Sequence, residues 1–516
     1  MPAQAQAGTT PRPRTGFDAN GWAGRQADRA YLQVLGSYLL EILAQGVHAD
    51  KIMMRRQSAR RFLSMPVFGA LVLAMGCGGG SLTSTSTSTS RMPQQNTVPA
   101  AFFGQNISDV SNYPSVPIGN MGKEIAAEWG YIEPDAPTGA GCPGTVNCTH
   151  TYNWSQLDSF VSTANFHRVQ FMWTYDQSPP WAVSNVGCSG SPPQCSGPIT
   201  DYPDFDAFIV ALATRYNGTN GHGIINVYEL NNEQDFSGTM TQLAMQSDHL
   251  VKDVHSINPT ALVVGMAYGD PDTSYASGNL FDQFWAAWGA IAGNVRHLDA
   301  VSFHGYPHGC CSPGGNPVPE IVAGSCVWDT GLGGSGFSDC VRQGATRNGI
   351  SSTTPIWDTE GSWGVNTDVS FTIDQQAAFI GRFELLNWSA GVSRQNWYSW
   401  DNVEWGTLCT GGPPCTLNVP GVAYRQVISW MVGSAMTSPC TPLGTVYTCS
   451  LTLASGTQAI AVWDTAGNSS FTAPAGYMRY KDLAGNATAI SGPITIGIQP
   501  LLLLSATAHY LNPSSD

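Results

Sequence analysis

The chain has 516 residues and a formal net charge of −14, and only 11% of its residues are charged. Nucleic acid binding requires clusters of Lys and Arg, so this acidic balance argues against nucleic acid as a partner. The length allows two to four domains and a large hydrophobic core.

The first part of the chain has the organisation of an export signal behind an unrelated extension. Met53 and Met54 are followed by four Arg, an apolar run over residues 62–75 and then Gly76-Cys77. A basic segment, an apolar segment and a small-residue cleavage site form a secretory signal peptide. We therefore predict a signal peptide over 53–76 and interpret 1–52 as a non-native upstream extension. The alternative is a genuine N-terminal extension with a short apolar helix.

Cys77 resembles the processing site of a bacterial lipoprotein, although Leu73 stands one position earlier than is usual for such sites. This predicts a lipid anchor at Cys77 as the sole attachment to a membrane, and a location in the cell envelope or outside the cell. Residues 77–99 are rich in Gly, Ser and Thr and contain few large apolar side chains. We predict that they form a flexible tether.

The cysteines agree with export. There are 13, and setting Cys77 aside leaves an even number. Close pairs across Gly- and Pro-rich loops indicate local disulfides of an oxidising compartment: Cys142 with Cys148, Cys188 with Cys195, Cys409 with Cys415, and Cys440 with Cys449. The pairing of Cys310, Cys311, Cys326 and Cys340 stays open. The sequence has no Cys-x-x-Cys pair or clear His/Cys ligand spacing, so we predict neither a metal site nor a cofactor.

From about residue 100, short apolar strands alternate with amphipathic helices. This alternation predicts a parallel sheet, and eight strands fit a closed (β/α)₈ TIM barrel over residues 100–436. The predicted strands lie at 101–106, within 115–129, and at 168–173, 227–233, 261–266, 298–304, 355–360 and 394–400. The predicted helices include 154–164, 205–216, one through Leu250 and Val254, 280–291, 375–386 and 424–431. Residues 183–203 and 307–354 are interpreted as loops.

The C-terminal part, residues 437–516, differs in pattern from the barrel. Short β-rich runs at 448–453, 459–463, 477–480 and 494–504 are separated by Gly, Asn and Asp turns, without helical periodicity. This pattern predicts a small antiparallel β-sandwich with a structural role.

Two glutamates end predicted barrel strands. Glu233 ends the fourth strand and Glu360 ends the seventh. Because all strands of such a barrel deliver their C-terminal ends to one face, we expect the two carboxyl groups to lie close together. Paired carboxyl groups across a cleft are the chemistry of glycosidic bond cleavage.

Several segments resemble clan A glycoside hydrolases. Residues 228–233 (Tyr-Glu-Leu-Asn-Asn-Glu) are similar to the fourth-strand signature, and 355–360 (Pro-Ile-Trp-Asp-Thr-Glu) to the seventh-strand nucleophile segment. Residues 304–306 and 397–400 resemble the sixth- and eighth-strand elements. Segments 129–134, 152–158 and 179–182 resemble glycoside hydrolase family 39 and related family 5 branches.

The resemblance implies specific roles. Glu233 would be the general acid/base and Glu360 the nucleophile of a retaining reaction. Asn232 would bind the 2-hydroxyl of the sugar, Tyr306 would donate to Glu360, and His304 would line the same face.

Other candidates have structural alternatives. Trp400 and Trp181 are predicted to contact substrate, although Trp400 would also suit barrel packing. Glu229 and Asp358 flank the two glutamates, but buried structural carboxylates are the expected reading of both. The clan commonly has an Arg at the end of the second strand. This chain has no Arg between Arg91 and Arg168, and Lys123 is the one Lys in that interval.

The leading hypothesis is a retaining glycoside hydrolase that cleaves β-linked glycosidic bonds of a polysaccharide or oligosaccharide by double displacement. A transglycosylase would use the same covalent intermediate. The alternative from another class is a catalytically silent carbohydrate-binding protein on the cell surface. The sequence does not specify the sugar, the linkage, or endo or exo action.

Overall fold

The computed structural model describes residues 97–123, 128–184, 187–233, 236–307, 318–328, 334–363, 371–402 and 405–506. The predicted signal peptide, Cys77 and nearly all of the predicted tether lie outside these residues. Val98, at the end of the predicted tether, belongs to the fold. It is buried and pairs with Val432, and its N–H donates to Ser434 O at 2.9 Å.

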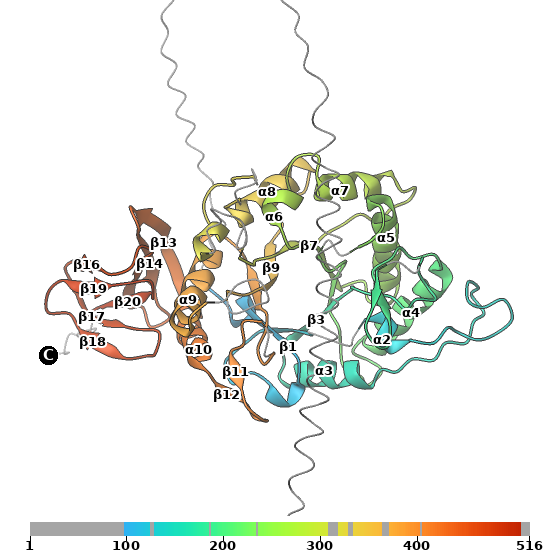
Figure 1. The fold of residues 1–516 in the computed structure, drawn as a ribbon, viewed down its shortest axis with the longest axis horizontal. Coiled ribbons are helices and arrows are strands. Elements are labelled where there is room, and N and C mark those ends of the chain that lie inside the picture. Colours follow the sequence, from blue (N-terminus) through green and yellow to red (C-terminus); the bar gives the residue numbers. More distant parts are fainter. Residues whose placement is uncertain are drawn as a thin grey trace, which may run out of the picture. The chain divides into compact units, whose positions relative to one another are not determined.

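The predicted (β/α)₈ barrel is confirmed (Figure 1). Eight parallel strands close in the order β1-β10-β9-β8-β7-β6-β3-β2. Their bounds are β1 Phe103–Ile107, β2 Asn120–Lys123, β3 Gln170–Thr174, β6 Val227–Glu229, β7 Leu262–Tyr268, β8 Ala300–His304, β9 Ile356–Gly361 and β10 Arg394–Trp397. Each lies within a few residues of the predicted strand. Two small hairpins, β4 Cys188–Ser189 with β5 Gln194–Cys195 and β11 Cys409–Thr410 with β12 Thr416–Leu417, lie in the connections.

Helices connect the strands around the barrel. They are α2 Trp129–Ile132, α3 Ser155–Phe166, α4 Tyr202–Arg215, α5 Met240–Ile257, α6 Pro271–Ser274, α7 Leu280–Ala290, α8 Phe337–Arg347, α9 Ile373–Ser389 and α10 Val419–Met431. Short 3₁₀ turns occur at η2 Ala100–Phe102, η3 Val110–Asn112 and η4 Pro319–Val322. Thr239 with Gln242, and Thr372 with Gln375, form capping boxes that satisfy the first N–H groups of α5 and α9.

Two expectations need correction. Residues 307–354 were predicted as a loop, but the described part contains η4 and α8. Six of the eleven residues of α8 are Gly, Ser, Thr or charged, which hid its helical face, although a parallel β8–β9 connection requires a crossover of this kind. In addition, the fourth strand ends at Glu229, four residues before Glu233.

Apolar side chains from neighbouring barrel strands pack against one another. Met172, Val227, Val264, Ala300 and Trp357 form one buried cluster from five strands. A larger cluster fills the layer between strands and helices.

The C-terminal part is antiparallel, as predicted. A six-stranded sheet has the order β13-β14-β15-β20-β17-β18, and β16 pairs with β19. The bounds are β13 Ala435–Leu443, β14 Val446–Thr452, β15 Gln458–Asp464, β16 Ser469–Phe471, β17 Tyr477–Lys481, β18 Ala487–Ala489, β19 Ile494–Ile496 and β20 Leu501–Ser505. The predicted single run at 494–504 is thus two strands in different sheets.

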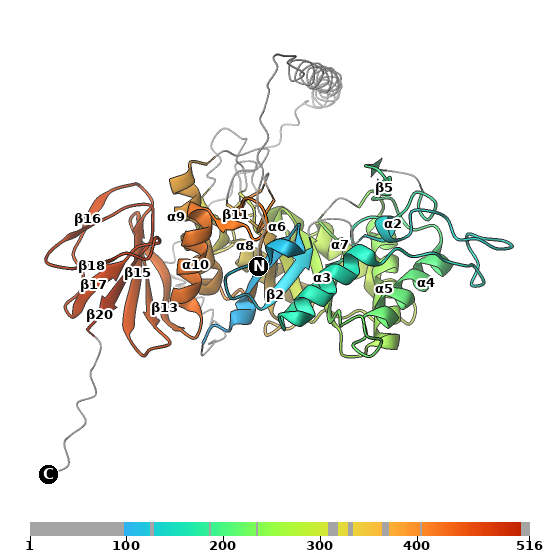
Figure 2. The same cartoon turned by 90° about the horizontal axis from the view of Figure 1, so that it is seen from below.

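This sheet packs beside α9 and α10 (Figures 1 and 2). The Cys440 N–H donates to Ser389 Oγ of α9 at 2.8 Å. Trp463 of β15 donates its indole N–H to Glu320 Oε1 of η4 at 2.8 Å. Arg382 of α9 is buried and also binds Glu320, with Nε 2.8 Å from Oε1. The sheet therefore contacts the β8–β9 connection as well as α9.

All four predicted disulfides are present: Cys142–Cys148, Cys188–Cys195, Cys409–Cys415 and Cys440–Cys449. Cys326 pairs with Cys340, which settles part of the open pairing. Cys310 and Cys311 lie outside the described residues. Within the described ranges, no helix combines the length and apolarity needed to span a membrane.

Candidate active site

Glu233 lies beyond the end of β6 in an extension of the strand. The Leu230 N–H donates to Val264 O at 2.9 Å and the Glu233 N–H to Ala267 O at 3.0 Å. Glu233 has a φ of +47°, which non-glycine residues rarely adopt. Asn231 Nδ2 donates to the carbonyl oxygen of Glu233 at 2.8 Å and supports this conformation. Backbone strain of this kind is characteristic of functional sites.

Glu360 and His304 come from adjacent strands. His304 ends β8 and is the register partner of Glu360 on β9. Two residues after His304, Tyr306 donates its hydroxyl to Glu360 Oε1 at 2.5 Å. The sequence predicted this donation.

His304 connects the two glutamates. Its Nδ1 lies 2.8 Å from Glu233 Oε1 and 3.8 Å from Glu360 Oε1. One carboxylate oxygen of each glutamate and the imidazole nitrogen all lie within 4.8 Å of one another. The side chains of Glu233 and Glu360 are 26% and 22% exposed, respectively, whereas the side chain of His304 is 1% exposed. The predicted convergence of the two glutamates is therefore observed, and both remain accessible.

Electrostatic interactions couple these groups. Burial opposes protonation of His304, but Glu360, Glu233 and Glu229 outweigh it and raise its pKa to about 10. Burial and the charge of Glu233 raise the pKa of Glu360 to about 7, against the opposing effects of His304 and Tyr306. The imidazole is thus a cation at neutral pH, and the carboxyl pair holds a proton into the neutral range.

The same three residues are the described group of His, Cys, Asp and Glu that could hold a metal ion. A histidine that binds a metal ion must offer a lone pair, so its imidazole must be neutral. His304 instead has a raised pKa and shares its Nδ1 proton with Glu233. The hydrogen bond between His304 Nδ1 and Glu233 Oε1 therefore occupies the nitrogen that would otherwise be a metal ligand.

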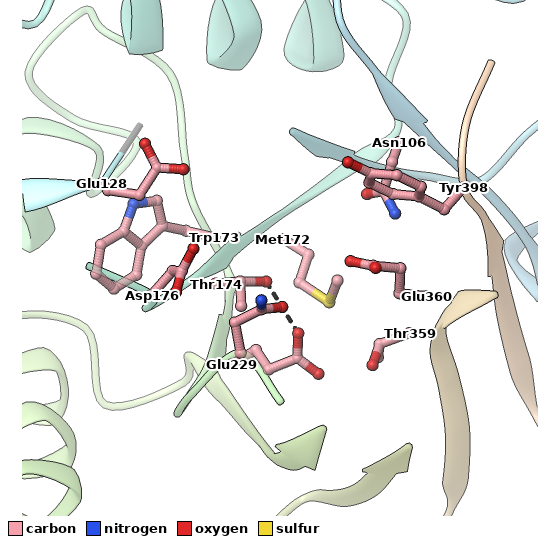
Figure 3. A pocket seen from close by; sticks show the side chains of 11 residues that line it. Asn106, Glu128, Met172, Trp173, Thr174, Asp176, Glu229, Thr359, Glu360 and Tyr398 are labelled. Atoms are coloured by element: carbon pink, nitrogen blue, oxygen red, sulfur yellow. Dashed lines mark hydrogen bonds between the residues drawn. The ribbon is translucent and has the colours of Figure 1, made fainter. Parts of the chain in front are cut away.

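A pocket of about 160 Å³ opens beside Glu360 (Figure 3). Glu360 and Thr359 line one side, Asn106 and Tyr398 lie above them, and Glu128, Trp173 and Asp176 lie on the opposite side. Its lining is Asn106, Glu128, Met172, Trp173, Thr174, Asp176, Glu229, Asn232, Thr359, Glu360 and Tyr398. These residues come from β1, β3, β6, β9 and the segments that follow strands. The pocket therefore occupies the C-terminal face, where the active sites of such barrels lie.

Glu229 and Asp358 have hydrogen-bonded structural positions. Glu229 accepts from Thr174 Oγ1 and from Ser302 Oγ, both at 2.9 Å, and is 1% exposed. Asp358 is fully buried and accepts from the Gly305 N–H at 3.0 Å. Burial raises the pKa of Asp358 well above its ordinary value. Glu229 also borders the pocket and contributes to the raised pKa of His304, so it influences the site without being part of the close pair.

The predicted substrate contacts divide into two groups. Asn232 lines the pocket. Trp400 is completely buried and donates its indole N–H to Asn112 O at 2.6 Å, so it is a packing residue rather than an open platform. Trp181 packs edge-on against Trp129, with ring centroids 5.3 Å apart, and is not among the lining residues. Both Trp residues were predicted to contact substrate because aromatic rings often bind sugars. In the structure, local packing determines where the two rings lie.

The sequence analysis missed Asn106, Thr359 and Tyr398. All three sit at or just after the ends of predicted strands, so their position on the C-terminal face could have been inferred. Asp176 lies two residues after the end of β3, so its position on the C-terminal face could have been inferred in the same way.

Clan A enzymes commonly have an Arg at the end of the second strand, and in this chain Lys123 is the candidate to replace it. Lys123 ends β2, but its side chain lies outside the described structure. Among the described side chains, His304 is the cation in contact with the glutamate pair.

No family model and no curated protein sequence matches the chain. Solved structures do resemble it. A family 39 glycoside hydrolase from the gut symbiont Bacteroides cellulosilyticus WH2 has a TM-score of 0.56 at 16% identity, covering 79% of this chain and 81% of that one. A monomeric β-xylosidase from Caulobacter crescentus CB15 has a TM-score of 0.52 at 12% identity, covering 81% and 98%.

A bifunctional glucanase-xylanase from a metagenome library has a TM-score of 0.51 at 15% identity, covering 80% of this chain and 97% of that one. At such identities the similarity establishes the fold. It agrees with the barrel that the resemblance to clan A implied.

Proposed function

We propose that the protein is a retaining glycoside hydrolase that cleaves β-linked glycosidic bonds of an oligosaccharide or polysaccharide. The proximity of Glu233 and Glu360, with carboxylate oxygens within 4.8 Å across His304, is the observation that carries this proposal. Retaining enzymes hold their carboxyl groups about 5–5.5 Å apart, whereas inverting enzymes leave about 6.5–9.5 Å for a water molecule.

The first step uses both glutamates. Glu360 attacks the anomeric carbon while the bond to the leaving oxygen breaks, and Glu233 transfers its proton to that oxygen. In the second step Glu233, now ionised, removes a proton from water. The water oxygen attacks the same carbon and releases Glu360 as a carboxylate. The proton taken from water restores the protonated Glu233.

Neighbouring side chains orient the pair. The Tyr306 hydroxyl donates to Glu360 and holds one of its oxygens. The charge of His304 lowers the pKa of Glu360, which favours the ionised nucleophile, while its hydrogen bond fixes Glu233. Asn232 borders the pocket and would bind a hydroxyl of the sugar.

Hydrolysis is tested with purified protein on a panel of plant and microbial oligosaccharides and polysaccharides, with sugar release as the readout. Glu233→Gln and Glu360→Gln should each lower turnover at least about 10²–10⁴-fold while the folded spectrum is preserved. Asp482→Asn, in a turn of the C-terminal sheet, is the charge-matched control and should leave turnover unchanged. Near-normal turnover of Glu360→Gln would refute the assignment. Binding without any turnover of the wild type would favour a silent carbohydrate-binding protein.

We also propose that the protein is exported and anchored by lipid at Cys77. The five disulfides are compatible with an oxidising compartment. Mass spectrometry of the mature N-terminus should find a lipid-modified Cys77, and Cys77→Ser should release the protein from membranes. An unmodified N-terminus upstream of residue 53 would contradict this proposal.

A further inference from the structure

The pocket beside Glu360 is rich in carboxylates. Of the eleven side chains that line it, Glu128, Asp176, Glu229 and Glu360 are acidic. None of these eleven described residues is Lys or Arg. Glu233 lies next to Glu360 through their shared contact with His304.

The described cation of the site is already engaged. His304 Nδ1 donates to Glu233 at 2.8 Å, and the His304 side chain has only 1% exposure. It is therefore not placed to pair with a charge on an incoming ligand. A ligand carboxylate in this pocket would lie beside the carboxylates of Glu229 and Glu360, with no Lys or Arg among the described lining residues to compensate its charge, which is strongly unfavourable.

The remaining polar lining suits neutral hydroxyl groups. Thr359 Oγ1 lines the pocket, belongs to a residue with 1% exposure, and has no hydrogen-bond partner in the described structure. Buried hydroxyl groups normally have partners, so this one points to a ligand group that supplies the bond. Asn106, with 4% exposure, and Asn232 add amide groups on the same lining. Carboxylates themselves accept hydrogen bonds from sugar hydroxyls.

We infer that the pocket selects an uncharged, hydroxyl-bearing sugar ring and rejects sugars that carry a carboxylate or sulfate. The inference deepens the proposed glycoside hydrolase activity and rests on it for the identity of the ligand as a glycoside. Asp176, two residues beyond β3 on the side of the pocket opposite Glu360, is the specificity residue that can be varied without touching the catalytic pair.

The test uses pairs of aryl glycosides that differ only at one carbon: 4-nitrophenyl β-glucoside with its β-glucuronide, and the β-galactoside with its β-galacturonide. The neutral member of a cleaved pair should have a kcat/KM at least about 100-fold higher than its uronate. Asp176→Asn should narrow this ratio by raising the relative rate on the uronate, whereas Asp482→Asn should not change it. Equal rates on both members, or faster cleavage of the uronate, would overturn the inference.

Thr359→Val provides a second arm, because valine keeps the shape and removes the hydroxyl. Loss of an unpartnered buried hydroxyl should raise the melting temperature, while KM for the neutral glycoside rises about 3- to 10-fold. A purely structural hydroxyl would leave KM unchanged, and that result would overturn the role of Thr359.

Calorimetric binding of glucose, galactose and their uronates to the wild-type protein separates this inference from the proposed reaction. Selective binding of the neutral sugars without turnover would support the inference and refute the hydrolase proposal. Preferential binding of the uronates would overturn the inference whether or not the enzyme cleaves glycosides.

Discussion

The Nδ1 atom of His304 lies 2.8 Å from Oε1 of Glu233, so a cationic imidazole bonds the proposed acid/base directly. The same nitrogen lies 3.8 Å from Glu360 Oε1, and its charge lowers the pKa of Glu360. In the described structure this histidine contributes the positive charge that the sequence analysis sought at the second strand.

Replacing His304 by Asn tests that role, because asparagine keeps a donor but has no charge. His304 lowers the pKa of Glu360, so its loss should raise that pKa and move the alkaline limb of the kcat/KM profile to higher pH. The maximal rate should fall about 10²-fold. His297→Asn, at an exposed histidine paired with Asp299, is the matched control. An alkaline limb that stays in place would contradict the account.

Stability should respond to the same histidine. Its folded pKa of about 10 lies above the ordinary value of 6.5. Its contribution to the free energy of unfolding is therefore fully present below pH 6.5 and is lost as the pH rises through about 10. Denaturant melts of wild type and His304→Asn should differ most below pH 6.5 and converge toward pH 10. A difference that grows with pH would have the wrong sign.

The wild-type pH–rate profile should fall on its alkaline side near neutrality. Burial and Glu233 raise the pKa of Glu360 to about 7, and for two interacting carboxyls this value belongs to the last proton of the pair. Above that pH the pair has no proton to give to the leaving oxygen. Measured kcat/KM should therefore decline as the pH rises through about 7. A rate that stays level to pH 9 would exclude a protonated carboxyl as the acid.

A second buried acid should control stability away from the site. Glu384 on α9 is fully buried, and both carboxylate oxygens lack hydrogen-bond partners in the described structure. Burial and the charge of Asp358 raise its pKa well above the ordinary value. Because the folded pKa is raised, this group's contribution is lost as the pH rises above about 4.5.

Glu384→Gln should therefore increase the free energy of unfolding at pH 8 and have little effect at pH 4. Chemical denaturation at the two values measures this difference. A variant that is equally destabilised at both pH values would show that Glu384 serves packing or an undetected bond instead.

The contact between the C-terminal sheet and the barrel can also be measured. Trp463 donates to Glu320, which also binds buried Arg382. Trp463→Phe removes a hydrogen bond to a charged group and should cost about 1.5–3 kcal/mol of stability. A double-mutant cycle with Glu320→Gln should show coupling between the two positions. Additive effects would mean that this bond contributes nothing to stability.

The sequence predicted the barrel and the proximity of Glu233 and Glu360 because both follow from local patterns. Apolar runs identified the eight strands, and barrel geometry then required Glu233 and Glu360 to converge. Tyr306 and Asn232 were found through motif resemblance. Helix α8 was missed because its polar composition conceals the inward face. Connectivity could have corrected this, since parallel strands need a crossover.

Residues that depend on packing could not be predicted in the same way. Trp400 is completely buried and its indole N–H donates to Asn112 O, and its residue type alone does not determine this position. The backbone conformation of Glu233 and the bridging position of His304 arise from contacts between strands far apart in sequence. Thr359 became a candidate because its hydroxyl has no partner, which only three-dimensional contacts reveal.

The stereochemistry of the first product tests the central claim most directly. If Glu360 attacks carbon and water then displaces it, two inversions leave the anomeric configuration unchanged. Proton NMR recorded in the first minutes of hydrolysis should therefore show the anomer of the substrate, before mutarotation equilibrates the product. An initially inverted anomer would mean that a water molecule attacks the sugar directly, and would contradict the pairing of Glu233 with Glu360.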